Sequence, residues 1–216
     1  MEIFVAPSIL SADFAKMGEE VEKITACGAD MIHCDVMDGI FVPNITFGPK
    51  MVKDIRKYTN LPLDVHLMIQ EPIKYIKEFV SAGSDYITVH YEACSDVKKT
   101  LEEIKSFGVK SGLVISPDTD ASVVEEFLPL CDMVLVMSVY PGFGGQKFIP
   151  ASINKLKKIS AMIKKVNPAI RLEIDGGINK QTASEVIKAG ADTLVAGSAV
   201  FGAPDCKQAI IDIKNA

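Results

Sequence analysis

Several features that would point to a membrane, secreted or nucleic-acid-binding protein are missing from this chain. It has no tryptophan and only three histidines, and none of its apolar runs reaches the roughly 18 residues that a membrane-spanning helix needs. The net charge is −5 and the basic residues are interspersed with acidic ones, which argues against a nucleic-acid surface. The first ten residues lack the basic region and the long apolar segment of a signal peptide. We therefore expect a soluble protein located in the cytoplasm.

Paired cysteine motifs are also missing. The five cysteines are scattered, without a CxxC pair, at Cys27, Cys34, Cys94, Cys131 and Cys206. An odd, scattered set is typical of reduced thiols in a cytosolic protein, so no disulfide is expected.

What the chain does have is a regular alternation of short apolar runs and longer amphipathic stretches. The apolar runs, rich in β-branched residues, predict strands at 3–9, 31–37, 63–67, 86–90, 111–115, 133–137, 171–174 and 193–196. The amphipathic stretches predict helices at 14–26, 49–58, 73–81, 96–107, 121–127, 151–165, 180–188 and 206–214. No linker divides the chain, so residues 1–216 are expected to form a single α/β domain.

A short repeat supports this count of units. The segments 27–30, 82–85 and 189–192 each carry a glycine at the second position and an aspartate at the fourth. Each segment closes a predicted helix and precedes a predicted strand, where a glycine suits the left-handed residue just past a helix end.

Eight strand–helix units in 216 residues favour a closed (β/α)₈ barrel, the TIM-barrel fold. The alternative is a doubly wound open sheet, which usually has fewer strands and a glycine-rich turn after the first. Here the first strand leads into residues 8–13, which contain no glycine, so the barrel is the preferred interpretation.

Polar residues collect where three of the predicted strands end. His33 and Asp35 lie on the second strand, His66 on the third and Asp175 on the seventh. Side chains alternate between the two faces of a strand, so His33 and Asp35 point the same way. In a (β/α)₈ barrel the ends of the strands meet at one mouth, where the chemistry takes place.

Each of these residues taken alone would suit a structural role in the core. Four such groups at one level would be costly to bury without compensation, and a divalent cation supplies it. Imidazole and carboxylate together suit zinc, iron, manganese or cobalt better than calcium. His90, at the end of the fourth strand, is interpreted as a neighbour of the ligands or as structural.

Glycines occupy three successive loops at the same mouth. Residues 141–146 follow the sixth strand, Gly176 and Gly177 the seventh, and Gly197 and Ser198 the eighth. Backbone N–H groups in these loops of a barrel often bind phosphate. The loop 141–146 could also close over a substrate as a flap and exclude water.

Two apolar features lie near the predicted mouth. Met37, Met68 and Met137 end three strands and could form a dry lining beside the reacting atoms, although ordinary core packing explains each one equally well. The loop 38–48 carries four large apolar residues and is expected to cover the site or a partner subunit, so a homo-oligomer is expected.

Along its whole length the chain strongly resembles the ribulose-phosphate 3-epimerase family. The resemblance rests on residues 6–13 (APSILSAD), 33–44 (HCDVMDGIFVPN), 64–68 (DVHLM), 141–148 (PGFGGQKF) and 173–178 (EIDGGI). It implies a (β/α)₈ barrel, the interconversion of ribulose 5-phosphate and xylulose 5-phosphate, and one divalent metal ion with no organic cofactor.

The resemblance also assigns roles residue by residue. It makes His33, Asp35, His66 and Asp175 the metal ligands, and Asp35 and Asp175 the acid/base pair. Its substrate-binding set is Ser8, His66, Gly142, Phe143, Gly144, Gly145, Gly176, Gly177, Gly197 and Ser198.

Two positions depart from the family pattern. Tyr140 stands where asparagine usually precedes the Pro-Gly-Phe sequence, and Ser116 stands where asparagine usually precedes Pro117. Both are expected near the mouth, so they leave the reaction type intact and bear on the sugar. The six-carbon alternative is a D-allulose-6-phosphate 3-epimerase with the same catalytic skeleton.

Epimerisation next to a ketone requires that one group remove a proton and another return one on the opposite face, through an enediolate. Two carboxylates suit this task, and a metal ion stabilises the developing charge. A Schiff-base aldolase would need a lysine at a strand end, and the eight predicted strands contain none. A sugar-phosphate-binding module without catalysis would need the glycines but not the paired carboxylates.

Overall fold

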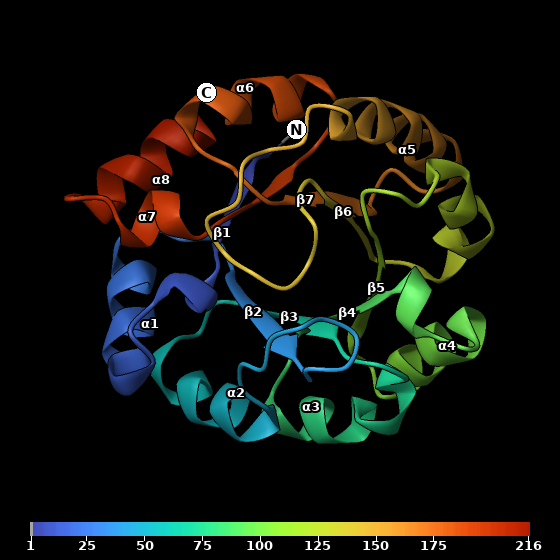
Figure 1. Cartoon of the computed structure of the whole chain (residues 1–216), viewed down its shortest axis with the longest axis horizontal. Coiled ribbons are helices and arrows are strands. Elements are labelled where there is room, and N and C mark those ends of the chain that lie inside the picture. The colour runs from blue at the N-terminus through green and yellow to red at the C-terminus, as the bar shows by residue number, and fades with distance from the viewer. Residues whose placement is uncertain (1) are drawn as a thin grey trace.

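The computed structural model describes residues 2–216 and shows eight parallel strands surrounded by helices (Figure 1). The strands are β1 (Phe4–Pro7), β2 (Ile32–Met37), β3 (Leu63–Met68), β4 (Tyr86–His90), β5 (Lys110–Ile115), β6 (Met133–Met137), β7 (Arg171–Asp175) and β8 (Thr193–Ala196). They form one sheet in the order β1-β8-β7-β6-β5-β4-β3-β2, which curls into a barrel. The predicted (β/α)₈ barrel is confirmed.

Helices cover the outside of the barrel. The α-helices are α1 (Met17–Ala26), α2 (Pro49–Ile55), α3 (Ile76–Ala82), α4 (Val97–Ser106), α5 (Ser152–Val166), α6 (Lys180–Lys188), α7 (Ser198–Phe201) and α8 (Cys206–Lys214). Short 3₁₀ segments precede or extend several of them, and one longer 3₁₀ segment, η6 (Ala121–Leu130), stands between β5 and β6. The strands are almost fully buried because the helices cover one face and the barrel interior the other.

Apolar side chains from the sheet and the helices form the main core, a shell around the barrel that includes Ile24, Val65, Phe79, Leu101 and Ile159. No helix within residues 2–216 is long and apolar enough to cross a membrane.

The seam between β1 and β2 is narrow. The only pairing between them is a single bridge, Ser8 with His33, placed just after β1 ends. The Ser8 hydroxyl also donates a hydrogen bond to Asp35 Oδ2 at 2.5 Å. The barrel is therefore closed by residues that belong to the predicted site.

The repeated glycine–aspartate segments end helices as predicted, and their aspartates also accept hydrogen bonds from strands. Gly28, Gly83 and Gly190 have φ of 93°, 97° and 109°, the left-handed side that favours glycine. The aspartate two residues later accepts a backbone N–H from the first or second residue of the preceding odd-numbered strand: Asp30 from Val5, Asp85 from Leu63 and Asp192 from Leu172. Asp132, outside the repeat, accepts from Ser111 in the same way.

Several predicted boundaries were wrong. The first strand ends at Pro7, since the chain turns into a 3₁₀ segment at Ile9–Ser11 that Ser8 caps. The predicted helix 121–127 is the 3₁₀ segment η6, whose Pro129 lacks the N–H that α-helical bonding uses. The short helix α7 was not predicted, and β5 begins one residue early at Lys110, at the end of the barrel far from the site.

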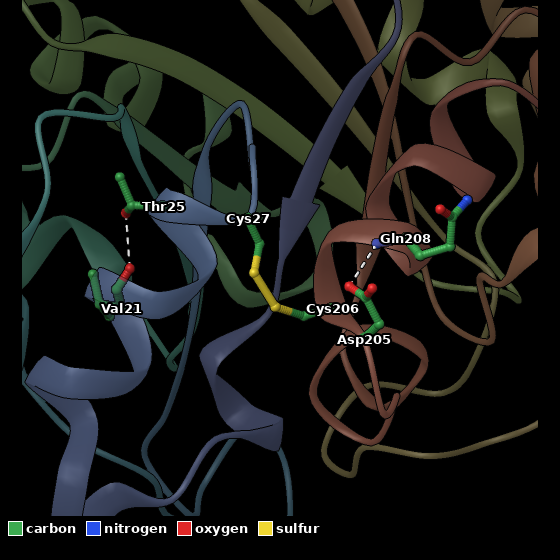
Figure 2. The surroundings of a disulfide bond; sticks show 6 residues. All are labelled: Val21, Thr25, Cys27, Asp205, Cys206 and Gln208. Carbon is green, nitrogen blue, oxygen red and sulfur yellow. Dashed lines mark hydrogen bonds between the residues drawn. A yellow bond between two sulfur atoms is a disulfide. The ribbon is translucent and has the colours of Figure 1, made fainter.

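The expectation that all five cysteines are reduced was also wrong. Cys27, just after α1, and Cys206, the first residue of α8, form a disulfide (Figure 2). The two positions are 179 residues apart in sequence, but the barrel brings their Cα atoms within 6.1 Å. Cys34, Cys94 and Cys131 are free thiols, as expected.

Candidate active site

The four predicted metal ligands meet inside the mouth of the barrel. Each of His33, Asp35, His66 and Asp175 offers one ligand atom, and these atoms all lie within 4.8 Å of one another. Asp35 on β2 pairs in register with His66 on β3, which places their side chains side by side. Asp35 Oδ1 lies 3.1 Å from His66 Nδ1 and 3.3 Å from His33 Nε2.

The donor set fits a divalent transition metal. His33 Nδ1 contacts Asp64 Oδ2 at 2.5 Å, which assigns the ring proton to that nitrogen. His33 Nε2 then faces the other ligands and has no hydrogen-bond partner, although the ring is fully buried. An orphaned buried nitrogen aimed at two carboxylates and an imidazole is what a metal ion would satisfy.

The two aspartates of the site differ in their affinity for protons. Burial alone would raise the pKa of Asp35, but the charge of His33 together with the hydrogen bond and charge of His66 hold it well below its usual range. Burial and the neighbouring charge of Asp35 raise the pKa of Asp175 to about 7. One carboxylate is thus held ionised while the other is able to hold a proton near neutral pH.

The interior beneath the ligands contains two more carboxyl groups that sequence analysis missed. Asp64 and Glu173 are fully buried, and Glu173 lies 3.8 Å from His33 Nδ1. Burial and the charge of Asp64 raise the pKa of Glu173 well above its usual value, which favours its neutral form. Burial alone would lower the pKa of His33, but the charges of Asp35 and Asp64 and the hydrogen bond with Asp64 raise it well above its usual value.

A signal for this lower layer is present in the sequence. Asp64 precedes His66 by two residues, and Glu173 precedes Asp175 by two, the same spacing as His33 and Asp35. Since residues at this spacing share one face of a strand, three strands each place two polar side chains inside the barrel.

His90 is a direct neighbour of the ligands. Its Nε2 lies 2.9 Å from His66 Nε2, and its Nδ1 lies 3.1 Å from Glu92 Oε2. Burial lowers the pKa of His90 to about 4, despite the carboxylate, and also lowers that of His66. Glu92 was missed in the sequence, although a carboxylate two residues after a strand-end histidine is a usable signal.

A cavity of about 500 Å³ opens above Asp35 and Asp175. Of the residues predicted to bind substrate, its lining contains Ser8, Gly142, Phe143, Gly144, Gly145, Gly176, Gly177, Gly197 and Ser198. His66 is fully buried and lies outside that lining, so its predicted contact with substrate remains a prediction. The segment after β6, yellow in Figure 1, passes across the mouth and forms part of the wall.

The three methionines also line this cavity. Met37 and Met68 pack together with Val42, and Met137 packs with Val114, Leu135 and Val139. All three are at most 3% exposed. They supply an apolar wall beside the two aspartates.

Ser116 and Tyr140 do not line the cavity, although both had been expected to bear on the sugar. The Tyr140 ring is 53% exposed, and its hydroxyl donates to Asp118 Oδ1 at 3.0 Å. Ser116 donates its backbone N–H to Glu92 Oε1 at 2.9 Å. Neither side chain therefore selects the sugar by contact from its present position.

The loop 38–48 is apolar and exposed at its outer edge. Ile40 is 76% and Ile45 75% exposed, whereas Val42 packs against the methionines. The loop thus covers part of the site, as one of the two predicted roles requires. Its contact with a partner subunit remains a prediction.

Comparison with known proteins identifies the family. A sequence profile described as the "Ribulose-phosphate 3 epimerase family" matches residues 4–201. The chain belongs to this family. It is 53% identical to the ribulose-phosphate 3-epimerase of Bacillus subtilis, with 99% of each chain covered.

Other relatives agree. The chloroplastic ribulose-5-phosphate-3-epimerase of Arabidopsis thaliana is 52% identical over 99% of this chain and 76% of its own. The ribulose-phosphate 3-epimerase of Escherichia coli K12 is 45% identical over 99% of this chain and 96% of its own. The resemblance seen in the sequence motifs is therefore confirmed at the level of the family.

Solved structures show the same barrel at low sequence identity. The 3-hexulose-6-phosphate synthase of Salmonella typhimurium aligns with a TM-score of 0.72 at 20% identity and covers 99% of this chain and 97% of its own. KGPDC from Streptococcus mutans aligns with a TM-score of 0.76 at 14% identity, over 100% of this chain and 97% of its own. At this identity these matches establish the fold only.

Proposed function

We propose that this protein is a metal-dependent ribulose-5-phosphate 3-epimerase that interconverts ribulose 5-phosphate and xylulose 5-phosphate. The observation that carries the proposal is the pair Asp35 and Asp175, which face one cavity with pKa values shifted in opposite directions. The family and the names of its relatives supply the sugar.

His33, Asp35, His66 and Asp175 would hold one divalent ion, and their mixed nitrogen and oxygen donors suit zinc, iron, manganese or cobalt. When bound, such an ion would supply Lewis-acid stabilisation of the negative charge that develops on the substrate oxygens.

The two aspartates move the proton. In one direction the ionised carboxylate of Asp35 removes the proton from C3, which lies next to the C2 ketone, and leaves an enediolate. Asp175 then gives its proton to C3 from the other face and inverts that centre. The two come from β2 and β7, strands separated by β1 and β8, so their carboxyl groups approach the cavity from different directions. The reverse reaction exchanges their roles, and no redox step occurs.

Ser8 holds Asp35 in place through its hydroxyl, and the apolar wall of methionines keeps water from the reacting carbons. The phosphate group is accommodated at the end of the cavity formed by the loops after β7 and β8, where Gly177, Gly197 and Ser198 offer backbone N–H groups.

Proton exchange at C3 tests this function. Ribulose 5-phosphate incubated with wild-type protein in heavy water should gain deuterium at C3, as read by NMR. Asp35→Asn and Asp175→Asn should each lower the exchange rate at least about 10³-fold, since each removes one of the two proton carriers. Asp118→Asn, a carboxylate at the mouth outside the cavity, is the matched control and should exchange normally. Normal exchange in either site mutant would remove that residue from the acid/base pair.

Metal removal and a second sugar complete the test. A strong chelator should abolish activity, and a divalent ion from the set above should restore it. Full activity of a rigorously metal-free preparation would contradict the ligand assignment. Allulose 6-phosphate should be a poorer substrate than ribulose 5-phosphate in side-by-side kinetics, because neither Ser116 nor Tyr140, the two departures from the family pattern, lines the cavity.

We also propose a cytoplasmic homo-oligomer in which the exposed edge of loop 38–48 contacts a partner copy. The exposure of Ile40 and Ile45 supports this assignment. Sedimentation of the wild type and of Ile40→Glu tests it, with a monomeric wild type as the contradicting result.

A further inference from the structure

A chain of hydrogen bonds leads from the candidate metal site to a carboxylate near the surface. His66 Nε2 lies 2.9 Å from His90 Nε2, and His90 Nδ1 lies 3.1 Å from Glu92 Oε2. Both histidine rings are fully buried, whereas the Glu92 side chain is 26% exposed. The proton transfer proposed for Asp35 and Asp175 involves neither His90 nor Glu92.

The position of Glu92 is fixed by the loop after β5. Its Oε1 accepts the backbone N–H of Ser116 at 2.9 Å and the hydroxyl of Thr119. Lys155 of α5 in turn donates to the backbone carbonyls of Ser116, Pro117 and Thr119, which holds this loop in place. With Oε1 occupied by two donors, Oε2 is left to face His90.

This arrangement dictates which nitrogen of each ring carries the proton. A carboxylate only accepts hydrogen bonds, so His90 must donate from Nδ1. The Nε2 atom of a neutral His90 is then bare and accepts, which requires His66 to donate from Nε2. The Nδ1 atom of His66 is then left bare, as a metal ligand must be, whereas without an ion Asp35 Oδ1 at 3.1 Å competes for a proton on this same nitrogen.

We propose that Glu92 is a positioning residue that, through His90, keeps His66 in the tautomer whose Nδ1 lone pair faces the metal site. The inference rests on the proposed function, because it assumes that His66 binds a metal. Asp64 orients the ring of His33 by direct contact, whereas Glu92 orients the ring of His66 through His90. Carboxylates that orient a ligating histidine commonly change metal affinity 10–100-fold when they are removed.

Glu92→Gln tests the proposal because it should reverse the direction of the hydrogen bonds that link residue 92, His90 and His66. Ser116 and Thr119 both donate to Oε1, so the amide oxygen of the glutamine would take that place and its NH₂ group would face His90. The amide would donate to His90 Nδ1, His90 would donate from Nε2, and His66 would carry its proton on Nδ1. A metal ion would then have to displace that proton.

The first readout is the tautomeric state itself, measured in the metal-free protein by long-range ¹⁵N–¹H NMR on histidine-labelled samples. The chain has only three histidines, so three rings account for the whole spectrum. In the wild type, Glu92 competes with Asp35, so His90 should be protonated on Nδ1 and His66 on Nε2 to a greater extent than in Glu92→Gln. In Glu92→Gln both protons should move to the other nitrogen, which a merely structural role for Glu92 would not cause.

The second readout is the affinity of the metal-free protein for Mn²⁺ alone, measured against a competing chelator. Glu92→Gln should weaken binding at least about tenfold. The matched control is Glu71→Gln, which removes a carboxylate that accepts from Ser95 and does not touch His90. It should bind Mn²⁺ like the wild type. Should Glu92→Gln fail to fold, Thr119→Val removes a single donor to Glu92 and should weaken binding to a smaller degree.

The outcomes separate this inference from the proposed function. Tight Mn²⁺ binding by the wild type with unchanged affinity and unchanged tautomers in Glu92→Gln would overturn the inference and leave the function intact. A wild-type protein that binds no divalent ion would overturn both. Reversed tautomers together with weakened binding would support the inference even if the sugar proved to be a different one.

Discussion

Burial alone would raise the pKa of Asp35, Asp175 and Glu173, and contact with imidazole reverses that effect only at Asp35. All three carboxyl groups lie near His33, but only Asp35 contacts two imidazoles, those of His33 and His66. Its pKa is held well below the usual range, whereas burial and neighbouring carboxylates raise the pKa of Asp175 and Glu173. The same residue type is thus suited to both of the roles proposed for it in proton transfer, as acid and as base.

Glu92 gives the stability of the protein a dependence on acidity. Burial would raise its pKa, but hydrogen bonds from His90, Thr119 and the Ser116 N–H lower it to about 2. A lowered pKa contributes stability above the unfolded value of about 4.5, and this contribution is lost as the pH falls toward 2. We therefore expect Glu92→Gln to cost about 1 kcal/mol at pH 7, a modest figure because the side chain is partly exposed to solvent.

Urea unfolding of the wild type and Glu92→Gln at pH 7, 5 and 3.5 measures this effect. The difference in the free energy of unfolding should shrink as the pH falls. A difference that stays constant over this range would contradict the lowered pKa of Glu92.

Gly177 is a second residue whose substitution has a predictable effect. Its φ is 64°, and a Cβ atom added to it would lie 2.5 Å from the backbone nitrogen of Phe148. Gly177→Ala should therefore lose about 1–2 kcal/mol to backbone strain and about 1–3 kcal/mol more to overpacking. It should also raise the KM for the sugar phosphate, because the loop after β7 must move away from the cavity wall.

Gly108→Ala is the matched control, since φ is 75° there and an added Cβ atom meets nothing within 4 Å. It should show only the strain. Thermal unfolding of both variants measures this difference. Equal losses of stability in the two variants would argue against close packing at Gly177.

The candidate ligands could be found from the sequence because they stand at strand ends in an alternating pattern. Asp64 and Glu173 were missed because each sits one pleat deeper, where a carboxyl group is tolerated only beside partners from other strands. Glu92 was missed because its role depends on a loop that lies 24 residues further along the chain. Such partnerships depend on the register between strands, which periodicity alone does not specify.

At the scale of elements, the barrel repeats one device four times. Asp30, Asp85, Asp132 and Asp192 each accept a backbone N–H from the first or second residue of the preceding odd-numbered strand. Each also pairs with a basic side chain: Lys214, Arg56, Lys105 and Arg171 respectively. Without the aspartate, this strand N–H would lack a partner at the end of the barrel far from the candidate site. These aspartates therefore stabilise strand pairs and do not shape the mouth of the barrel.

Asp30 tests this device, because it joins β1 to α8 through Val5 and Lys214. Asp30→Ala should cost about 1–3 kcal/mol by leaving a buried N–H without its partner. Lys214→Ala should cost less than about 1 kcal/mol, since it removes only a partly exposed ion pair. Chemical denaturation of both variants gives the comparison, and an equal cost would show that the ion pair dominates.

The number and order of elements could be predicted because each strand and helix has its own period. Their ends could not, because short 3₁₀ segments such as Pro72–Lys74 and Arg56–Tyr58 continue or precede a helix without any change in the apolar pattern. The conformation of η6 depends on its packing against α4 and α5, which the sequence of that segment does not encode.

At the scale of the whole molecule, the Cys27–Cys206 disulfide connects the first helix to the last. The cysteines are too distant in sequence for any local motif, which is why composition pointed to free thiols. Only the return of α8 beside β1 and α1 brings them together (Figures 1 and 2).

The disulfide should stabilise the barrel by about 2–4 kcal/mol, because it restricts the unfolded chain across nearly its whole length. Cys27→Ser and treatment of the wild type with a reductant should lower the free energy of unfolding by the same amount. Cys94→Ser, which changes a free thiol, is the control and should retain its response to reductant. Equal stability of the oxidised and reduced wild type would contradict this prediction.

The position of β1 between β8 and β2 has a consequence for protein synthesis. β1 emerges first from the ribosome, but its neighbour β8 is made nearly 190 residues later, so the nascent chain cannot complete the ring until its last segment is released. Asp175 joins the ligands from β2 and β3 at the same late stage. Partly synthesised chains would thus lack a complete candidate metal site, and the proposed activity would report only on molecules whose barrel has closed.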